Sequence, residues 1–566
     1  MSAHMGFKNG IREGLWWVPV VAALAVLPFF WRGTSNGHDL PFHVNTWIEA
    51  VLHWKAGILY PHWAAFANHG SGEPRFVFYP PVSWTAGALL GLILPWQAVP
   101  GTLSALVCVA AGVSMFLFAR EWLDDRTAVM AAILYAVDPY LLVVIYERCA
   151  YGEMVAAIWL PGILLFALRE RGGFARNTLL LGLHVAAIWL TNLPSAVIAS
   201  YLLAIIVIAR AVQLRRLEPM LRAAAAMALG LGLAGFYLVP AVYEQRWIQI
   251  GQAVSPGASP RYNFLFAHTD DAEHDVVLLH TSIFAMLEFV AVALFAWIAR
   301  PLRQRSASLF SILLGTATFA AFMMTPPSLV FWTHAPKLLF VQFPWRWLLV
   351  VNLSLTFLAA VSFARIRASR LALVAVVPLV IGVCYWQFQQ RIYPEDRPAA
   401  QAEAIASGEG YDGTDEYLPT AADNSQLEPY APRIAIQIAS EDEDQRKIAP
   451  SSLVHSTFQV WDVEKKRFTV DAQVPTRNTL RLLDYPAWNV EVDGKAYPRA
   501  ADETTGRMVL ELPAGHHEVA IDYTRTPDRT WGQVLSAIAF LAAIGLWITG
   551  RNSQLTTETL KHRAFL

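Results

Sequence analysis

Long apolar stretches recur along most of this 566-residue chain and limit its fold more than any other feature. A helix needs roughly 20 apolar residues to cross the ~30 Å hydrocarbon core of a bilayer. Such runs lie near residues 15–31, 101–119, 127–145, 154–168, 178–191, 194–210, 223–242, 281–299, 307–324, 345–363, 371–388 and 531–549. The runs predict a polytopic α-helical membrane protein with about 12 transmembrane helices.

The composition agrees with a membrane protein and excludes other classes. Charged residues make up 15% of the chain, against roughly 25% in soluble domains. Aromatic residues make up 12%, which excludes an intrinsically disordered chain. The 43 basic and 44 acidic residues nearly cancel, so no nucleic acid partner is expected. The three cysteines, Cys108, Cys149 and Cys384, are too few for a disulfide framework.

A shorter apolar run at 81–98 decides the orientation of the helices that follow it. It begins after Pro80 and contains Pro95, and these features leave open whether it crosses the bilayer. If it does not cross and the N-terminus is cytoplasmic, the arginine clusters between spans all fall on the cytoplasmic side, as the positive-inside rule requires; if it crosses, those after the first loop fall outside. We therefore expect a juxtamembrane helix that does not cross. These clusters hold Arg120, Arg126, Arg169, Arg171, Arg176, Arg210, Arg215, Arg216, Arg222, Arg300, Arg303, Arg305, Arg365, Arg367 and Arg370.

This topology divides the chain into three parts. We expect a transmembrane domain at 1–388 with its first outer loop at 32–98, an outer segment at 389–530, and a last span with a cytoplasmic tail at 531–566. Within the outer segment, alternating stretches such as KRFTVDAQV, TLRLLDY, WNVEVDGKAY and HHEVAIDY are typical of strands. They predict a small β-sandwich at about 455–525, with hairpin turns at VDGK (Gly494) and PAGH (Gly515).

The first outer loop places a carboxylate at the membrane surface. His38 and Asp39 closely follow the first span, and the stretch after them is amphipathic at helical spacing, which is typical of an interfacial helix. A carboxylate backed by apolar helices can have its pKa tuned for use as a base. The five histidines of the loop (His38, His43, His53, His62 and His69) fit interfacial hydrogen bonding or a metal role, and the spacing leaves both open.

Several cations are expected on the same face as this carboxylate. Arg148 lies with Glu153 between two apolar runs, and Arg346 lies between two tryptophans in QFPWRWL. Arg261 and Lys337 belong to later outer segments. An arginine at the membrane edge suits a phosphate at headgroup depth, although snorkelling beside an aromatic belt is the alternative. Bases together with cations fit transfer chemistry on a lipid-linked phosphate.

Motifs spread over most of the chain carry a resemblance to a known superfamily. They are GHDLPFH, GILYPHW, FVFYPP, the loop from Arg148 to Glu153, FPWRW, DEYLP and YPAWNVEVDGK…LPAGHHEVAIDY. Together they resemble the GT-C membrane glycosyltransferases. More narrowly, they resemble bacterial membrane proteins labelled "6-pyruvoyl-tetrahydropterin synthase-related" and the YfhO-like family. The pterin label does not suit this chain, because that soluble zinc enzyme has no membrane spans.

The resemblance implies a GT-C-like fold and sugar transfer from a polyprenyl-phosphate carrier to a glycan or lipid acceptor, usually with inversion. It implies that Asp39 acts as the catalytic base or helps to position it, with Glu153 as a second acidic position. His38, His43 and Tyr79 of the matching motifs are expected to bind substrate, together with the cations named above. It also implies a bacterial inner membrane protein that works on the extracytoplasmic face among membrane lipids.

Departures from the superfamily pattern limit which of its properties are expected of this chain. The second outer loop has no Asp-x-Asp, and the C-terminal domain has no WWD-type acceptor motif. Transfer to protein asparagine is therefore not expected, no metal ligands are assigned, and a divalent metal ion is left open as a cofactor. Two other functions stay in consideration: a transporter or flippase for lipid-linked glycans, and a non-catalytic envelope-assembly protein.

Overall fold

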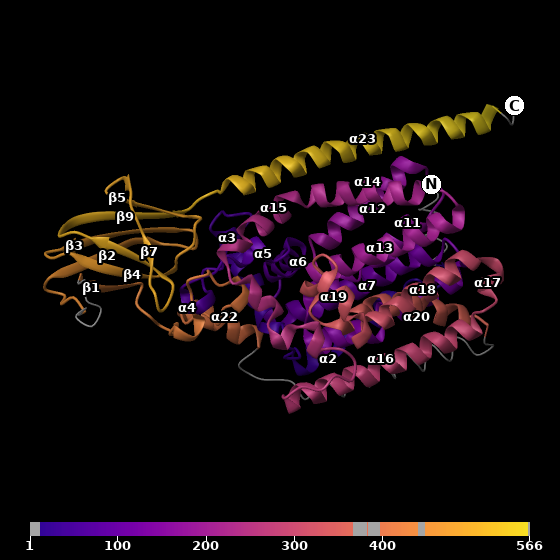
Figure 1. Ribbon diagram of the computed structural model, residues 1–566, viewed down its shortest axis with the longest axis horizontal. Helices are drawn as coiled ribbons and strands as arrows, with labels where there is room; N and C mark the ends of the chain where they lie inside the picture. Colours follow the sequence, from indigo (N-terminus) through magenta and orange to yellow (C-terminus); the bar gives the residue numbers. More distant parts are fainter. Residues whose placement is uncertain (1–11, 366–381, 383–396, 440–447, 564–566) are drawn as a thin grey trace.

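A computed structural model describes residues 12–365, 382, 397–439 and 448–563 of the chain. Helices form an elongated body, and a β-domain lies at one end of its long axis (Figure 1). We call this the β-domain end. The last helix, α23 (Pro527–Arg563), leaves the β-domain and runs along the whole helical body (Figure 1).

Every predicted apolar run within the described residues is helical. Seven helical segments are long and apolar enough to cross a membrane, or up to nine when two bent pairs each count as one span. The protein is therefore an integral membrane protein. Runs 15–31 and 178–191 form shorter helices of 16 residues, and run 371–388 lies outside the described residues except for residue 382. The count of about 12 spans stays a prediction.

The helical body is built from the following elements. They are α2 (Trp17–Arg32), α7 (Val99–Ala119), α8 (Asp125–Ala136), α9 (Pro139–Val143), α10 (Tyr151–Ala156), α11 (Leu160–Leu168), α12 (Phe174–Trp189), α13 (Leu193–Leu214), α14 (Glu218–Leu233), α15 (Gly235–Glu244), α16 (Ala272–Ile298), α17 (Leu302–Arg305), α18 (Ala307–Met323), α19 (Leu329–His334) and α20 (Leu348–Phe363).

The loops rich in arginine meet at the end of the body opposite the β-domain. Arg210 forms an ion pair with Glu170, and Arg169 lies 3.6 Å from Glu121. Arg222 donates a 3.0 Å hydrogen bond to the carbonyl of Arg169. Both termini lie at this end as well (Figure 1). These contacts join loops that the sequence predicts on one side of the membrane.

The first outer loop folds against the β-domain end of the body. Its helices are α3 (Leu40–Lys55), α4 (Ala67–Gly70), α5 (Arg75–Phe78) and α6 (Pro81–Gly91). With 11 residues, α6 is about 16 Å long, well short of a bilayer core. Its length suits the juxtamembrane helix predicted for 81–98.

A buried ion pair connects the first outer loop to the outer segment. The Glu73 carboxylate accepts a 2.7 Å hydrogen bond from Arg75 and a 2.8 Å bond from the backbone of Thr414. Thr414 lies beyond α22 (Pro398–Ser407), so the loop and the outer segment hold each other in place.

The β-domain is a sandwich of two antiparallel sheets, with strand orders β1-β4-β8-β7 and β2-β3-β9-β5-β6. Its strands are β1 (Ile434–Ile438), β2 (Val454–Trp461), β3 (Lys465–Ala472), β4 (Thr476–Leu483), β5 (Trp488–Val492), β6 (Lys495–Ala496), β7 (Ala500–Ala501), β8 (Arg507–Leu512) and β9 (Gly515–Tyr523). The first strand therefore precedes the expected start at about 455.

The two expected hairpin turns have different outcomes. Asp493 and Gly494 have φ of 53° and 73° and join the paired strands β5 and β6, as a two-residue hairpin requires. The turn at Gly515 joins β8 and β9, which belong to different sheets. The expected hairpin at PAGH is therefore wrong. This turn crosses between the sheets, because β9 pairs with β3 and β5 instead.

A buried group at the base of α23 fixes the β-domain to the helical body. We call it the junction cluster: Glu244, Tyr485, Tyr523 and Arg529. Arg529 donates two hydrogen bonds of 2.8 and 2.9 Å to the Glu244 carboxylate, and the Tyr485 hydroxyl donates a third of 2.6 Å. Because the three residues come from α23, α15 and the β-domain, the domain is held in a defined orientation.

Candidate functional site

The predicted site residues Arg148 and Glu153 lie where the chain turns between two apolar helices. Asp138 begins the turn by accepting a 2.8 Å hydrogen bond from the backbone N–H of Leu141. The helix then widens into a π-helical turn at Val144–Arg148, and Cys149 ends it with φ of 50°. Irregular turns of this kind concentrate at functional sites. Here the turn directs Arg148 back toward Glu153 at the start of α10.

Glu153 is the centre of a fully buried charged group. Its carboxylate accepts hydrogen bonds from Arg148 at 2.5 Å, from Arg346 at 3.2 Å and from the hydroxyl of Tyr140 at 2.6 Å. The side chain of Glu153 is 1% exposed, and those of both arginines are 9% exposed. We call Tyr140, Arg148, Glu153 and Arg346 the arginine cluster. With two guanidinium groups and one carboxylate, it carries an excess positive charge.

Arg346 reaches the cluster from the FPWRW motif, a 3-10 turn at Pro344–Trp347. Its Nη1 group donates to the carbonyl of Val341 at 2.8 Å and to the side chain of Gln342 at 3.0 Å. The ring of Phe343 lies 5.0 Å from the Arg346 guanidinium and 6.0 Å from that of Arg148. Cation–π contacts of this length hold both guanidinium groups in place without neutralising their charge.

Asp39 lies beside the arginine cluster and is accessible. The Asp39 carboxylate is 4.0 Å from the Arg148 guanidinium, and its side chain is 41% exposed. The Asp39 backbone N–H donates a 2.9 Å hydrogen bond to the carbonyl of Arg148. Gly37 makes this approach feasible, because a Cβ there would lie 2.5 Å from the carbonyl oxygen of Glu147. The structure therefore brings the first two outer loops together as one site.

His43 and Tyr79 form the wall beside Asp39. Their rings lie 5.7 Å apart, and Phe42 packs 4.7 Å from Tyr79. Burial lowers the pKa of His43 to about 4, although the Asp39 carboxylate opposes the shift. His43 is thus neutral at pH 7, and none of the described residues gives its buried Nδ1 a hydrogen-bond partner. Burial raises the pKa of Tyr79, and Asp39 adds to the shift.

The Tyr79 hydroxyl also approaches the helix that carries Glu153. A Cβ at Gly152 would lie 2.7 Å from this hydroxyl, so only glycine leaves room for it. His43 and Tyr79 therefore both lie near Asp39, and their role in binding substrate stays a prediction.

The remaining predicted residues stand apart from this site. His38 is exposed next to Asp39. Arg261 and Lys337 are also exposed, and no hydrogen bond or ion pair among the described residues joins either to Asp39 or Glu153. The ammonium group of Lys337 instead lies 5.1 Å from the ring of Phe340.

Three residues of the site were not predicted from the sequence: Tyr140, Phe343 and Gly37. Tyr140 lies within an apolar run, where a tyrosine gives no distinct signal. Phe343 belongs to the FPWRW neighbourhood, so that motif was a usable signal. Gly37 precedes His38 and Asp39, but its close contact with the second loop depends on the tertiary fold.

The histidines of the first outer loop have separate partners. His53 Nδ1 lies 2.8 Å from the carbonyl of Glu49, His62 faces Glu464, and His69 lies 3.1 Å from Asp412. Across the part of the chain that the structure describes, no group of three or more His, Cys, Asp or Glu side chains is arranged to hold a metal ion.

Comparisons with known proteins give one distant likeness. No family model matches the chain, and no curated protein matches it, so the two bacterial families suggested by the motifs are not confirmed. The apo crystal structure of the Archaeoglobus fulgidus oligosaccharyltransferase shares 16% identity, with a TM-score of 0.42 over 71% of this chain and 56% of that one. The oligosaccharyltransferase AglB of the same organism, in complex with an inhibitory peptide and a dolichol-phosphate, shares 16% identity with a TM-score of 0.41 over 70% and 56%.

The likeness covers a little over half of the length of those proteins. At this identity and TM-score it does not decide the activity of this chain. The function is therefore inferred from the residues of the site.

Proposed function

We propose that this protein is a membrane glycosyltransferase that moves a sugar from a polyprenyl-phosphate carrier to an extracytoplasmic glycan or lipid acceptor, with inversion. The observation that carries the proposal is the arginine cluster beside Asp39. It combines two buried guanidinium groups with an accessible carboxylate at the β-domain end of a membrane protein. We place this end on the extracytoplasmic face of a bacterial inner membrane, because the arginine-rich loops lie at the other end.

Asp39 is assigned as the general base. Of the two acidic positions, it is the one with an accessible side chain, so an acceptor hydroxyl can reach it. As the acceptor oxygen attacks the anomeric carbon, the bond to the phosphate oxygen breaks and the acceptor proton passes to Asp39. General bases of this kind contribute about 10²- to 10⁴-fold to the rate.

Arg148 and Arg346 are assigned to the phosphate of the carrier. Buried, fixed guanidinium groups stabilise the charge that develops on the leaving phosphate without reorganising during the reaction. Glu153 accepts hydrogen bonds from three donors and is 1% exposed. We therefore assign it a positioning role, in which it holds both arginines, rather than the role of a base.

Transport of a lipid-linked glycan is the second candidate function. Glu288 of α16 is buried in a membrane helix, and Asn352 of α20 donates hydrogen bonds of 3.0 and 2.9 Å to its two carboxylate oxygens. Ionisable residues inside membrane spans often mark substrate or ion pathways. This pair therefore favours transport, whereas Asp39 and the arginine cluster favour transfer.

An assay with purified protein in liposomes separates the two candidates. Wild type is supplied with radiolabelled polyprenyl-phospho-sugars, and the release of polyprenyl phosphate is followed. We expect turnover by wild type and a loss of about 10²- to 10⁴-fold in Asp39→Asn. Asp412→Asn is the matched control, because Asp412 is a 90% exposed aspartate outside the site. Turnover unchanged in Asp39→Asn rejects Asp39 as the base, and lipid translocation without release of polyprenyl phosphate supports transport instead.

A further inference from the structure

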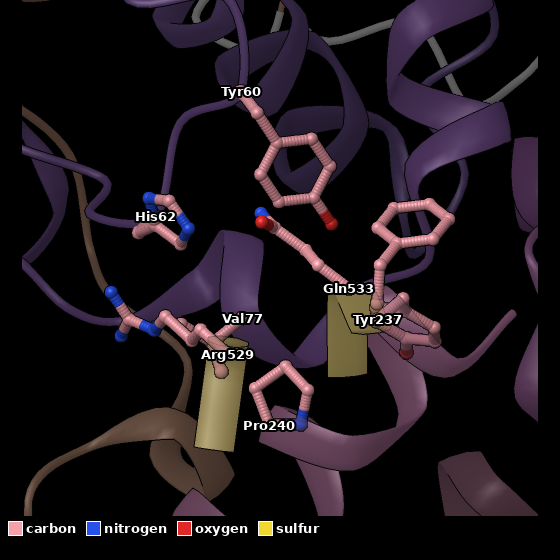
Figure 2. A pocket seen from close by; sticks show the side chains of 8 residues that line it. Tyr60, His62, Val77, Tyr237, Pro240, Arg529 and Gln533 are labelled. Atoms are coloured by element: carbon pink, nitrogen blue, oxygen red, sulfur yellow. The ribbon is translucent and has the colours of Figure 1, made fainter. Parts of the chain in front are cut away.

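A cavity of about 270 Å³ lies next to the candidate site, on the other side of α5. It is lined by Tyr60, His62, Val77, Phe236, Tyr237, Pro240, Arg529 and Gln533 (Figure 2). The FVFYPP segment forms the wall between the two spaces, since Val77 lines the cavity and Tyr79 lies beside Asp39. The cavity therefore adjoins the place where an acceptor hydroxyl would react.

The walls of the cavity are fixed before any ligand binds. The Tyr237 hydroxyl donates a 2.5 Å hydrogen bond to the carbonyl of Phe78. α15 and α23 touch beside the cavity, where a Cβ at Gly532 would lie 2.6 Å from the carbonyl oxygen of Gly235. The junction cluster holds Arg529 in place. A ligand therefore meets a formed site and little ordering cost.

The cavity offers hydrogen bonds, and the charged group that lines it is paired. The Arg529 guanidinium donates two hydrogen bonds to the Glu244 carboxylate. Burial lowers the pKa of His62, whose imidazole lies 3.8 Å from the Glu464 carboxylate.

The Tyr60 hydroxyl and the Gln533 amide point toward the space between them (Figure 2). The Gln533 amide oxygen accepts a hydrogen bond from Arg525, so its amide nitrogen is the group that can donate to a ligand. Among the described residues the Tyr60 hydroxyl has no hydrogen-bond partner, so it is available to a ligand.

Aromatic and apolar surfaces complete the lining. Tyr60 packs edge-on against Phe236 at 5.8 Å, and Tyr237 and Pro240 form the facing wall. Drug-sized ligands occupy pockets of roughly 300–1,000 Å³, so this smaller cavity suits one ring-sized group. A small group with both an apolar face and hydroxyl groups matches such a lining, and an uncharged sugar ring is a group of that kind.

We propose that the cavity is a binding subsite for one uncharged sugar residue of the acceptor. This inference rests on the proposed function, because that function makes a sugar acceptor relevant here. The ring packs on the aromatic walls, while its hydroxyl groups exchange hydrogen bonds with Tyr60 and Gln533. The next sugar or the reacting hydroxyl then extends past the FVFYPP segment toward Asp39.

The test measures binding directly, in the absence of donor. Methyl glycosides of glucose, galactose, mannose and N-acetylglucosamine are titrated into the full-length protein in nanodiscs and followed by saturation-transfer NMR. Methyl glucuronoside serves as the charged comparison. We expect saturable binding of at least one neutral glycoside, and binding about tenfold weaker in Tyr60→Phe and in Gln533→Leu. Both variants keep the size of the side chain, so the fold is preserved.

Val534→Leu is the matched control, because Val534 is the next residue of α23 and is 43% exposed. It should bind glycosides like wild type. Absence of saturable binding to every neutral glycoside overturns the inference, as does binding that both cavity variants leave unchanged. Labelling of Tyr60 or Gln533 by a photoactivatable acyl-chain lipid, with no competition from glycosides, also overturns it in favour of a lipid tail.

Failure of the sugar subsite can be distinguished from failure of the proposed transferase function. Release of polyprenyl phosphate by wild type without glycoside binding rejects the cavity and keeps the transferase. Glycoside binding that depends on Tyr60 and Gln533, without turnover of any donor, keeps the sugar subsite and rejects the transferase.

Discussion

Glu153 and Glu244 are both buried at the β-domain end of the helical body, and they differ in how open their charged surroundings are to solvent. Glu244 in the junction cluster pairs with one arginine through two hydrogen bonds. Glu153 in the arginine cluster pairs with two arginines, and the half-exposed Asp39 carboxylate lies beside them. The first group is balanced and closed. The second has two arginines and two carboxylates, but one of those carboxylates, Asp39, is half-exposed and leaves the group open on one side.

This difference separates a structural ion pair from a functional one. A buried pair with balanced charge can fix the orientation of two parts of a protein without attracting a ligand. A charged group with a half-exposed member keeps one side open to a substrate, as at Asp39. Burial alone therefore does not identify a site, whereas access to the charged groups does.

The largest expected effect comes from removing one charge in each cluster. Glu244→Gln leaves Arg529 buried without a charged partner, which costs about 3–5 kcal/mol of stability. Glu153→Gln has a comparable cost and, if the proposed function holds, also abolishes turnover, because both arginines assigned to the phosphate lose their support. Thermal unfolding and donor turnover measured on both variants check this. Full turnover by folded Glu153→Gln would remove the functional distinction between the clusters.

A conservative change at Arg346 should reduce catalysis by about 10²- to 10³-fold. Lysine keeps the charge in Arg346→Lys, but one ammonium group cannot contact both Glu153 and the Val341 carbonyl as the guanidinium does. Steady-state kinetics with varied donor measure the loss. Arg477→Lys in the β-domain is the control, because that arginine pairs with Asp502 and Glu511 away from the site. Equal kinetics for both variants contradict the assignment.

Gly37→Ala tests whether the two outer loops must touch. The new Cβ would clash with the backbone at Glu147, so Asp39 moves away from Arg148. A misplacement of about 1 Å costs on the order of 10²-fold in rate. We expect a lower kcat together with a lower thermal midpoint, because Gly37 is buried and the Cβ would meet backbone atoms of the second loop. A variant that unfolds instead shows that the contact is structural.

The smallest expected effect is a pH dependence of stability at His43. The folded pKa of about 4 lies below the usual 6.5, so below pH 6.5 the unfolded chain binds the proton more readily. The contribution of His43 to stability is therefore complete above pH 6.5 and is lost as the pH falls toward 4. Unfolding measured across this window should become less pH-dependent in His43→Gln. An identical slope in wild type and variant contradicts the prediction.

The sequence predicted the elements that depend on local pattern. Apolar runs specify helices, because each run must satisfy its own backbone hydrogen bonds in a bilayer. Alternation located β3, β4, β5 and β9, and the stretch GRMVLEL located β8. It missed β2 and β7, and it missed β1, which pairs with β4 from a stretch of only five residues. It also did not show that β8 and β9 belong to different sheets. Sheet membership depends on partners far away in the chain.

The site was predicted only in part, because sequence pattern does not show which distant segments touch. Asp39, Arg148, Glu153 and Arg346 were proposed from charge beside membrane spans, and the structure brings these four together. Arg261 and Lys337 were proposed on the same ground, but they are not in contact with them. A charged residue at the end of a span indicates how deep it lies in the membrane. Whether two loops touch depends on how the helices pack, as for Glu153 and Arg346, which are 193 residues apart.

The junction cluster also sets the order in which the protein can finish folding. Glu244 and Arg529 are separated by 285 residues, so the carboxylate is synthesised and inserted long before its partner exists. Every intermediate that lacks α23 therefore holds the Glu244 carboxylate without its arginine partner.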